Sequence, residues 1–275
     1  MMQYKLNMPV CFLYLVLVLM AGCEHHRSMG RIVESGHFIQ SIHRSTFFAH
    51  IVLANSQFNS NDHSILYVFL EGDGLPWKTH TQISSDPQPI YPLALDLMTK
   101  SQFPSIYLQR PCYGVKEAIC DAQWWTNKRY SRQVVESMTQ VLRKLSANYK
   151  QITLVGYSGG GTLAALIAPE LNNVTTLITL AGNLDHKQWA SYHRYSRLQG
   201  SLNPVDYVLP STLKQFHYAA ENDINILPQW IKGYSDTQKN SQFILLKNAD
   251  HSCCWIKNWQ RIVNRVQHSD INESN

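Results

Sequence analysis

The chain has 275 residues, which is long enough for one α/β domain with a sizeable buried core. A hydrophobic fraction of 44% and an aromatic fraction of 11% exclude a disordered chain, a collagen-like repeat and a coiled coil. The net charge of +5 is spread along the sequence without a long run of like charges, so a nucleic-acid partner is not expected.

Residues 1–22 have the features of an export signal. Lys5 is followed by an uncharged stretch from Met8 to Gly22. As a helix, this stretch would span about 22 Å, less than the roughly 30 Å hydrocarbon core of a bilayer. A cleaved signal peptide is therefore preferred to a transmembrane anchor, which stays open as an alternative.

The stretch ends in Met20-Ala21-Gly22-Cys23, which resembles the lipobox of bacterial lipoproteins, with methionine where leucine is usual. The resemblance implies that residues 1–22 are removed as a signal peptide. It also implies that a diacylglycerol on Cys23 anchors the protein to a membrane of the bacterial cell envelope, at the outer membrane or the periplasmic face. An ordinary secretory signal with an incidental cysteine is the alternative. Residues 23–36 are polar with two glycines and are predicted to be a flexible tether before the folded domain of residues 37–275.

Four cysteines remain in the predicted mature chain once Cys23 carries lipid: Cys112, Cys120, Cys253 and Cys254. An even number in an oxidising compartment suggests disulfides, and Cys112–Cys120 is the simplest pairing because it closes a short loop. Two free buried thiols are the alternative, and a bridge between the neighbours Cys253 and Cys254 is not favoured. The cysteines and histidines do not have zinc-site spacing, so neither a metal nor another cofactor is expected.

The rest of the chain alternates apolar runs of strand length with helical patterns. The runs lie at residues 47–54, 65–70, 105–109, 151–155, 175–180, 215–220 and 242–246. Their nearly continuous apolar sequence is typical of strands that are covered on both faces of a mostly parallel sheet. Helices are predicted after Ser131 as N-cap, from Gly161 to about Leu171, and from Trp255 to Val266. This alternation predicts a doubly wound α/β sheet.

The clearest chemical motif is G-x-S-x-G within Leu154-Val155-Gly156-Tyr157-Ser158-Gly159-Gly160-Gly161. An apolar strand precedes it and an apolar helix follows. A tight strand-to-helix turn exposes the serine oxygen and accepts only small residues two positions away on either side. The motif therefore predicts Ser158 as a nucleophile, with the Gly159 N–H aimed at the same space. A glycine-rich turn without chemistry is the alternative.

With this motif the sequence resembles the α/β-hydrolase superfamily over residues 45–267. The resemblance implies that family's fold, with a mostly parallel central sheet, helices on both faces and a small cap near residues 183–212. It also implies an acid and then a histidine downstream of the serine. Asp223 follows a predicted strand and is the expected acid, with Glu221 as its competitor. His251 follows the last predicted strand and is the expected base, while His186, His193 and His217 are expected to be structural or to line the substrate site.

The loop after residues 65–70 reads Glu71-Gly72-Asp73-Gly74 and resembles the oxyanion turn of the same family, with Glu71 where histidine is usual. The resemblance implies that the backbone N–H of Asp73, or next that of Gly72, completes an oxyanion hole with Gly159. Trp77 and the pair Trp124-Trp125 could border the mouth of the site or simply pack.

These residues predict a serine hydrolase of the cell envelope that cleaves carboxylic esters, as esterases and lipases do, through an acyl-enzyme on Ser158. A serine peptidase of the same fold stays open, because the shape of the acyl pocket separates ester from peptide substrates. A non-catalytic lipoprotein that binds a partner is the third hypothesis, and it would need none of the three predicted catalytic residues.

Overall fold

The computed structural model describes residues 29–36, 38–60 and 64–271 of the chain. Its centre is an eight-stranded sheet in the order β1-β2-β4-β3-β5-β6-β7-β8. The second strand, β2 (Ala49–Ala54), is antiparallel to both of its neighbours in the sheet, β1 (Ile39–Arg44) and β4. The strands after β2 are mutually parallel: β3 (Ile65–Leu70), β4 (Ser105–Leu108), β5 (Gln151–Tyr157), β6 (Val174–Leu180), β7 (Lys214–Ala220) and β8 (Ser241–Leu246). This confirms the predicted mostly parallel sheet.

The central strands are apolar throughout because their alternate side chains enter two different cores. In β3, Val68 belongs to one buried cluster and Phe69 to the other, and Leu154 and Val155 divide in the same way in β5. Successive side chains of a strand point to opposite faces, so a strand covered on both faces needs no polar side. Strand β1 lacks this pattern because it is an exposed edge, and the sequence did not reveal it.

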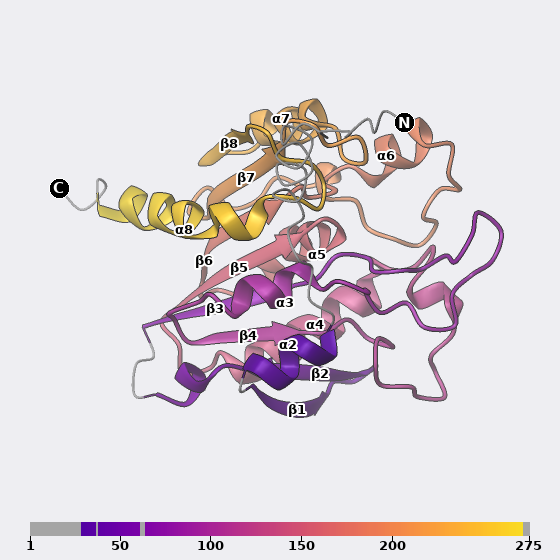
Figure 1. Cartoon of the computed structure of the whole chain (residues 1–275), viewed down its shortest axis with the longest axis horizontal. Helices are drawn as coiled ribbons and strands as arrows, with labels where there is room; N and C mark the ends of the chain where they lie inside the picture. The colour runs from indigo at the N-terminus through magenta and orange to yellow at the C-terminus, as the bar shows by residue number, and fades with distance from the viewer. Residues whose placement is uncertain (1–28, 37, 61–63, 272–275) are drawn as a thin grey trace, which may run out of the picture.

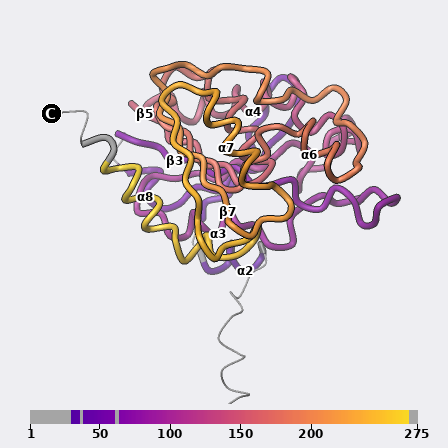
Figure 2. Tube along the Cα trace, turned by 90° about the horizontal axis from the view of Figure 1, so that it is seen from above, coloured from indigo at the N-terminus to yellow at the C-terminus, as the bar shows by residue number. Residues whose placement is uncertain are grey.

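Helices cover both faces of the sheet (Figures 1 and 2). One face carries α2 (Met29–Gly36), α3 (Leu93–Met98) and α8 (Trp255–Ile271). The opposite face carries α4 (Arg132–Leu145), α5 (Gly159–Ile167) and α7 (Pro228–Thr237). Single 3-10 turns lie at η1 (Ser56–Asn59), η2 (Ala122–Trp124) and η3 (Ala168–Glu170). The predicted N-cap is confirmed, since the Ser131 side chain accepts a hydrogen bond from the Val134 N–H.

Helix α2 corrects the prediction of a flexible tether for residues 29–36 of the predicted range 23–36. Ile32 is fully buried in the core beneath α3 and α8, and Val33 packs against the same cluster. Two adjacent apolar residues on a short helix give little sequence pattern, so their burial depends on the surface that α3 supplies. Residues 1–28, with the predicted signal peptide and Cys23, lie outside the described residues. Within the described ranges, no helix is long and apolar enough to cross a membrane.

The segment predicted as a cap lies between β6 and β7. Its regular structure is α6 (His186–Tyr192) and the 3-10 turn η4 (Pro204–Asp206). Asp185 caps α6 by accepting the N–H groups of Lys187 and Gln188. Ala190 and Asn203 are buried, so much of this segment packs onto the body of the domain.

Two disulfides are present among the described cysteines. Cys112 and Cys120 are bonded, with their Cα atoms 5.5 Å apart. Cys253 and Cys254 are also bonded to each other. This second bridge, which was not favoured from the sequence, lies in the loop between β8 and α8.

Candidate active site

Ser158 stands alone between the end of β5 and the start of α5, as predicted. Its φ of 50° and ψ of −119° lie in a region that residues with a side chain rarely adopt. The flanking glycines permit the turn. A Cβ on Gly156 would lie 2.3 Å from the Gly160 oxygen, and a Cβ on Gly160 would lie 2.1 Å from the Leu70 oxygen. The close approach of β5, α5 and β3 therefore requires glycine on both sides of the serine.

Ser158, His251 and Asp223 form one chain of hydrogen bonds. His251 Nε2 lies 3.1 Å from the Ser158 hydroxyl, and His251 Nδ1 lies 2.8 Å from Asp223 Oδ2. The Asp223 side chain is fully buried, whereas that of His251 is 23% exposed. The other Asp223 oxygen accepts the N–H groups of Asn225 and Ile226 at 2.8 and 2.9 Å. This arrangement brings together the three residues that were predicted from their order in the sequence.

Glu221, the competing acid, points elsewhere and accepts the Asn248 N–H. His217 is enclosed in β7, where its ring bonds to Thr179 and burial lowers its pKa to about 3. His186 is also buried, and its Nε2 contacts the Leu202 carbonyl. These three residues therefore have structural partners away from Ser158.

The backbone of the histidine loop is held by two aromatic donors. The Tyr157 hydroxyl and the Trp255 indole N–H both donate to the His251 carbonyl, at 3.0 and 2.9 Å. The Tyr157 ring also lies 5.3 Å from the His251 ring, centroid to centroid. Tyr157, which precedes Ser158, and Trp255, the first residue of α8, thus hold the backbone of His251 in place.

Asn225 is a site residue that the sequence analysis missed. Its Oδ1 accepts the Trp189 indole N–H at 3.1 Å, so its amide nitrogen faces His251 Nε2, 3.2 Å away. His193 Nε2 lies 2.8 Å from the Asn225 carbonyl. Two ring side chains of the cap thus hold Asn225, Trp189 by its side-chain amide and His193 by its backbone carbonyl. The only sequence signal was proximity to Asp223, because an asparagine has no catalytic signature of its own.

The loop after β3 borders the nucleophile, and one of its predicted donors is already occupied. The Gly72 N–H donates to Glu71 Oε1 at 3.1 Å, so the expectation that it serves the oxyanion hole is corrected. A Cβ on Gly72 would lie 3.4 Å from the Ser158 Cβ, which shows how closely the loop approaches. Within the described chain, the N–H groups of Asp73 and Gly159 have no hydrogen-bond acceptor and remain the candidate oxyanion donors.

Glu71 ties this loop to α3. Its second carboxylate oxygen accepts the N–H groups of Ala94 and Leu95, at 3.0 and 3.5 Å. Burial raises the pKa of Glu71 to about 7, against the lowering effect of these N–H donors. The glutamate that replaces the usual histidine is therefore a structural link.

The tryptophans expected near the site are spread over different surroundings. Trp77 is partly exposed in the segment between β3 and α3, which projects from the body (Figure 2). Trp125 is buried and donates to the Ser84 carbonyl.

A surface cavity of about 480 Å³ lies between β8 and α8, lined in part by Lys247, Lys257 and Arg261. No triad residue lines it.

Comparison with solved structures identifies the fold. An esterase from Pyrococcus furiosus superposes with a TM-score of 0.58 at 10% identity, covering 85% of this chain and 92% of the other. Naproxen esterase (carboxylesterase NP) from Bacillus subtilis gives 0.54 at 12% identity, covering 90% and 95%. A lipase-esterase related protein from Clostridium acetobutylicum gives 0.53 at 14% identity, covering 82% and 98%. No protein-family model and no curated protein sequence matches the chain. The chain therefore has the α/β-hydrolase fold, as predicted.

Proposed function

We propose that this protein is a serine hydrolase that cleaves carboxylic esters through an acyl-enzyme on Ser158. The observation that carries the proposal is the chain of hydrogen bonds from Ser158 through His251 to the buried Asp223. The 3.1 Å between Ser158 Oγ and His251 Nε2 is within the distance at which a general base takes a proton from a nucleophile. The ester class is supported by the solved structures of the same fold that are described as esterases.

The reaction follows from the positions of these groups. Ser158 Oγ attacks the ester carbonyl as its proton passes to His251 Nε2, and Asp223 holds the imidazole by accepting from Nδ1. The oxygen of the tetrahedral intermediate accepts the N–H groups of Asp73 and Gly159. His251 then gives its proton to the leaving alkoxide, and the acyl group stays on Ser158. Water then attacks the acyl carbon as its proton passes to the same imidazole, and His251 returns that proton to Ser158 Oγ as the bond to the acyl group breaks and the acid leaves. No step needs a metal or an organic cofactor.

Covalent labelling tests the enzyme hypothesis directly. A fluorophosphonate probe should label the wild type and fail to label Ser158→Ala. The exposed Ser191→Ala in α6 is a matched control that should keep the label. Equal labelling of wild type and Ser158→Ala would contradict Ser158 as the nucleophile, and a wild type that takes no label would favour a non-catalytic binding role.

The substrate class is tested separately from the nucleophile. Turnover of p-nitrophenyl esters beside peptide anilides should favour the esters, with kcat/KM higher for at least one ester than for any anilide. A preference for anilides would place the same triad in a peptidase.

We further propose that the enzyme acts at the bacterial cell envelope, held to the membrane by a diacylglycerol on Cys23. The Ala21-Gly22-Cys23 sequence after a short apolar stretch supports this placement. Labelled palmitate should enter the wild type and be absent from Cys23→Ser. A Cys23→Ser protein that carried label and sedimented with membranes would contradict the proposed anchor.

A further inference from the structure

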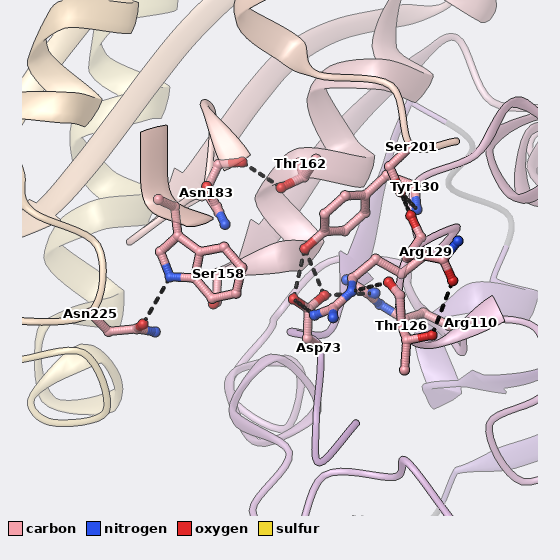
Figure 3. A network of polar contacts seen from close by, with 12 residues as sticks. Asp73, Arg110, Thr126, Arg129, Tyr130, Ser158, Thr162, Asn183, Ser201 and Asn225 are labelled. Carbon is pink, nitrogen blue, oxygen red and sulfur yellow. Dashed lines mark hydrogen bonds and ion pairs between the residues drawn. The ribbon is translucent and has the colours of Figure 1, made fainter. Parts of the chain in front are cut away.

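A buried cluster of charges surrounds the side chain of Asp73. Asp73 Oδ1 lies 2.8 Å from Arg110 Nη1, and Oδ2 lies 2.8 Å from Arg129 Nη1. The Tyr130 hydroxyl is 2.7 Å from both carboxylate oxygens (Figure 3). The arginines are 3% and 4% exposed, and Tyr130 is fully buried. Burial alone would raise the pKa of Asp73, but Arg129, Arg110 and Tyr130 bring it down to about 2. Asp73 is therefore ionised across the physiological pH range.

This cluster is costly for the fold. The two guanidinium groups are buried and the Asp73 side chain is only 17% exposed, so these charges are largely withdrawn from water. Buried ion pairs commonly contribute little net stability, because desolvation offsets their attraction. A contribution to stability is therefore a weak explanation for this cluster. Its position beside Gly159 suggests a role in the candidate active site.

The surrounding contacts leave one donor of the loop unoccupied. The Glu71 carbonyl accepts Arg110 Nε at 3.3 Å, and the Gly72 N–H donates to the Glu71 side chain. The Asp73 carbonyl accepts the Tyr113 hydroxyl at 2.8 Å, and the Asp73 carboxylate is held by the cluster. Of these groups in the described chain, the Asp73 N–H is the one without an acceptor, and it lies beside the nucleophile turn. The loop is thus fixed around a donor that is free to bind an incoming oxygen.

The carboxylate of Asp73 also rests against Gly159. A Cβ on Gly159 would lie 2.1 Å from Asp73 Oδ1 and 2.5 Å from the Tyr130 hydroxyl. The two residues whose N–H groups are the candidate oxyanion donors are therefore in direct contact through the Asp73 side chain. Their separation is set by this contact, and only glycine at position 159 allows it.

We propose that the Asp73 side chain is a positioning residue for the oxyanion hole. Clamped by Arg110, Arg129 and Tyr130, it holds the Asp73 N–H in a fixed relation to Gly159 before substrate binds. Preorganised donors stabilise a developing oxyanion strongly because they need no rearrangement during the reaction. This inference rests on the hydrolase function proposed above.

Two variants test the clamp. Asp73→Asn keeps the size of the side chain but removes its charge and faces one guanidinium with an amide NH₂. We expect kcat to fall about 100-fold with KM changed less than about threefold, as for the loss of an oxyanion donor. Tyr130→Phe removes one hydroxyl only and should lower kcat by about tenfold, which keeps the test available if Asp73→Asn does not fold. A trifluoromethyl ketone that mimics the tetrahedral intermediate should lose affinity in both variants in parallel with kcat/KM.

Tyr149→Phe is the matched control. It removes the hydroxyl of another buried tyrosine, which donates to the Phe58 carbonyl at 2.8 Å, far along the chain from the loop. It should lower the melting temperature, as Tyr130→Phe should, and leave kcat unchanged. An active wild type in which both clamp variants keep kcat within about twofold would overturn the positioning role alone. A wild type that neither turns over esters nor takes the fluorophosphonate label would overturn the hydrolase proposal and this inference with it.

Discussion

The two sides of Ser158 are built differently. On the β3 side, which is the loop Glu71-Gly72-Asp73 after β3, the Asp73 carboxylate is bound by two buried arginines and a buried tyrosine. On the opposite side, the loop of His251 runs through exposed residues, with Asp250 accepting the N–H groups of Ser252 and Cys253. Figure 3 shows the charged cluster and Asn225 on opposite sides of the nucleophile.

Under the proposed function, this difference matches what the two sides would have to do. Oxyanion donors act best when they cannot move, because reorganisation during the reaction adds to the barrier. A general base exchanges protons with alcohol and water, so it needs access to solvent. We therefore expect the β3 side to tolerate little change in shape and the histidine side to tolerate changes that leave the imidazole in place.

The largest effect should come from the triad itself. Ser158→Ala and His251→Ala should each lower kcat by about 10⁴-fold or more, because the groups of a triad act as a unit. Neither change creates a core cavity, so thermal melts should stay close to the wild type. His80→Ala, an exposed histidine of the projecting loop, is the control and should keep full turnover. Near-normal turnover by His251→Ala would mean that another histidine is the base.

Gly159→Ala should disrupt the contact between Gly159 and the Asp73 side chain. The new Cβ would overlap Asp73 Oδ1 and the Tyr130 hydroxyl, so the clamp must open. We expect kcat to fall about 100-fold, together with a lower melting temperature. Gly233→Ala makes the same substitution in α7, where the Cβ meets nothing within 4 Å. That control should keep activity and gain about 0.5–1 kcal/mol of stability. Unchanged turnover in Gly159→Ala would show that the contact does not set the donor geometry.

Glu71 should make the stability of the β3 side depend on pH. Its pKa rises from 4.5 to about 7 on folding, so the folded state holds the proton more tightly. The wild type then loses stability as pH rises from about 4.5 to 7, and the loss is complete above 7. Glu71→Gln lacks this titration, so between pH 4 and pH 8 its unfolding free energy should gain about 3 kcal/mol relative to the wild type. Urea melts of the wild type and Glu71→Gln at several pH values would measure this difference in unfolding free energy. The exposed Glu136→Gln is the control. A pH-independent gap between wild type and Glu71→Gln would exclude the raised pKa.

The two disulfides allow the smallest and most direct comparison of the sides. Replacing Cys112 and Cys120 by serine opens a loop next to Arg110 and should cost about 2–3 kcal/mol of stability. Replacing Cys253 and Cys254 by serine opens no loop of comparable length. Because the His251 carbonyl keeps its hydrogen bonds from Tyr157 and Trp255, kcat/KM in this second variant should stay within about threefold. Ester turnover and thermal melts of the two double variants would test this, and a larger loss of turnover in the second would show that its bridge positions the base.

The sequence predicted the parts of the site that depend on local pattern. The glycines around Ser158 are required by the turn itself, and Asp223 and His251 follow strands whose apolar sequence is plain. The same applies to the central sheet, because strands buried on both faces are apolar at nearly every position.

The features that were missed depend on distant contacts. Arg129 reaches Asp73 across 56 positions, and Trp189 reaches Asn225 across 36. A lone arginine or asparagine has no periodic pattern, so its partner appears only in the folded chain. Gly72 was mistaken for an available donor because the orientation of the Glu71 side chain cannot be read from the sequence.

The docking of α2 has a consequence for how the protein lies relative to its surroundings. If Cys23 carries the lipid that we propose, only residues 24–28 separate the anchor from a helix whose Ile32 is fixed in the core. Five residues reach at most about 18 Å, which is close to the radius of gyration of a domain of this size. The domain would then be joined to the lipid by a short linker that limits its distance from the bilayer and its range of orientations. Lengthening this linker would change the distance and tilt of the candidate active site relative to the lipid surface without altering any residue of that site.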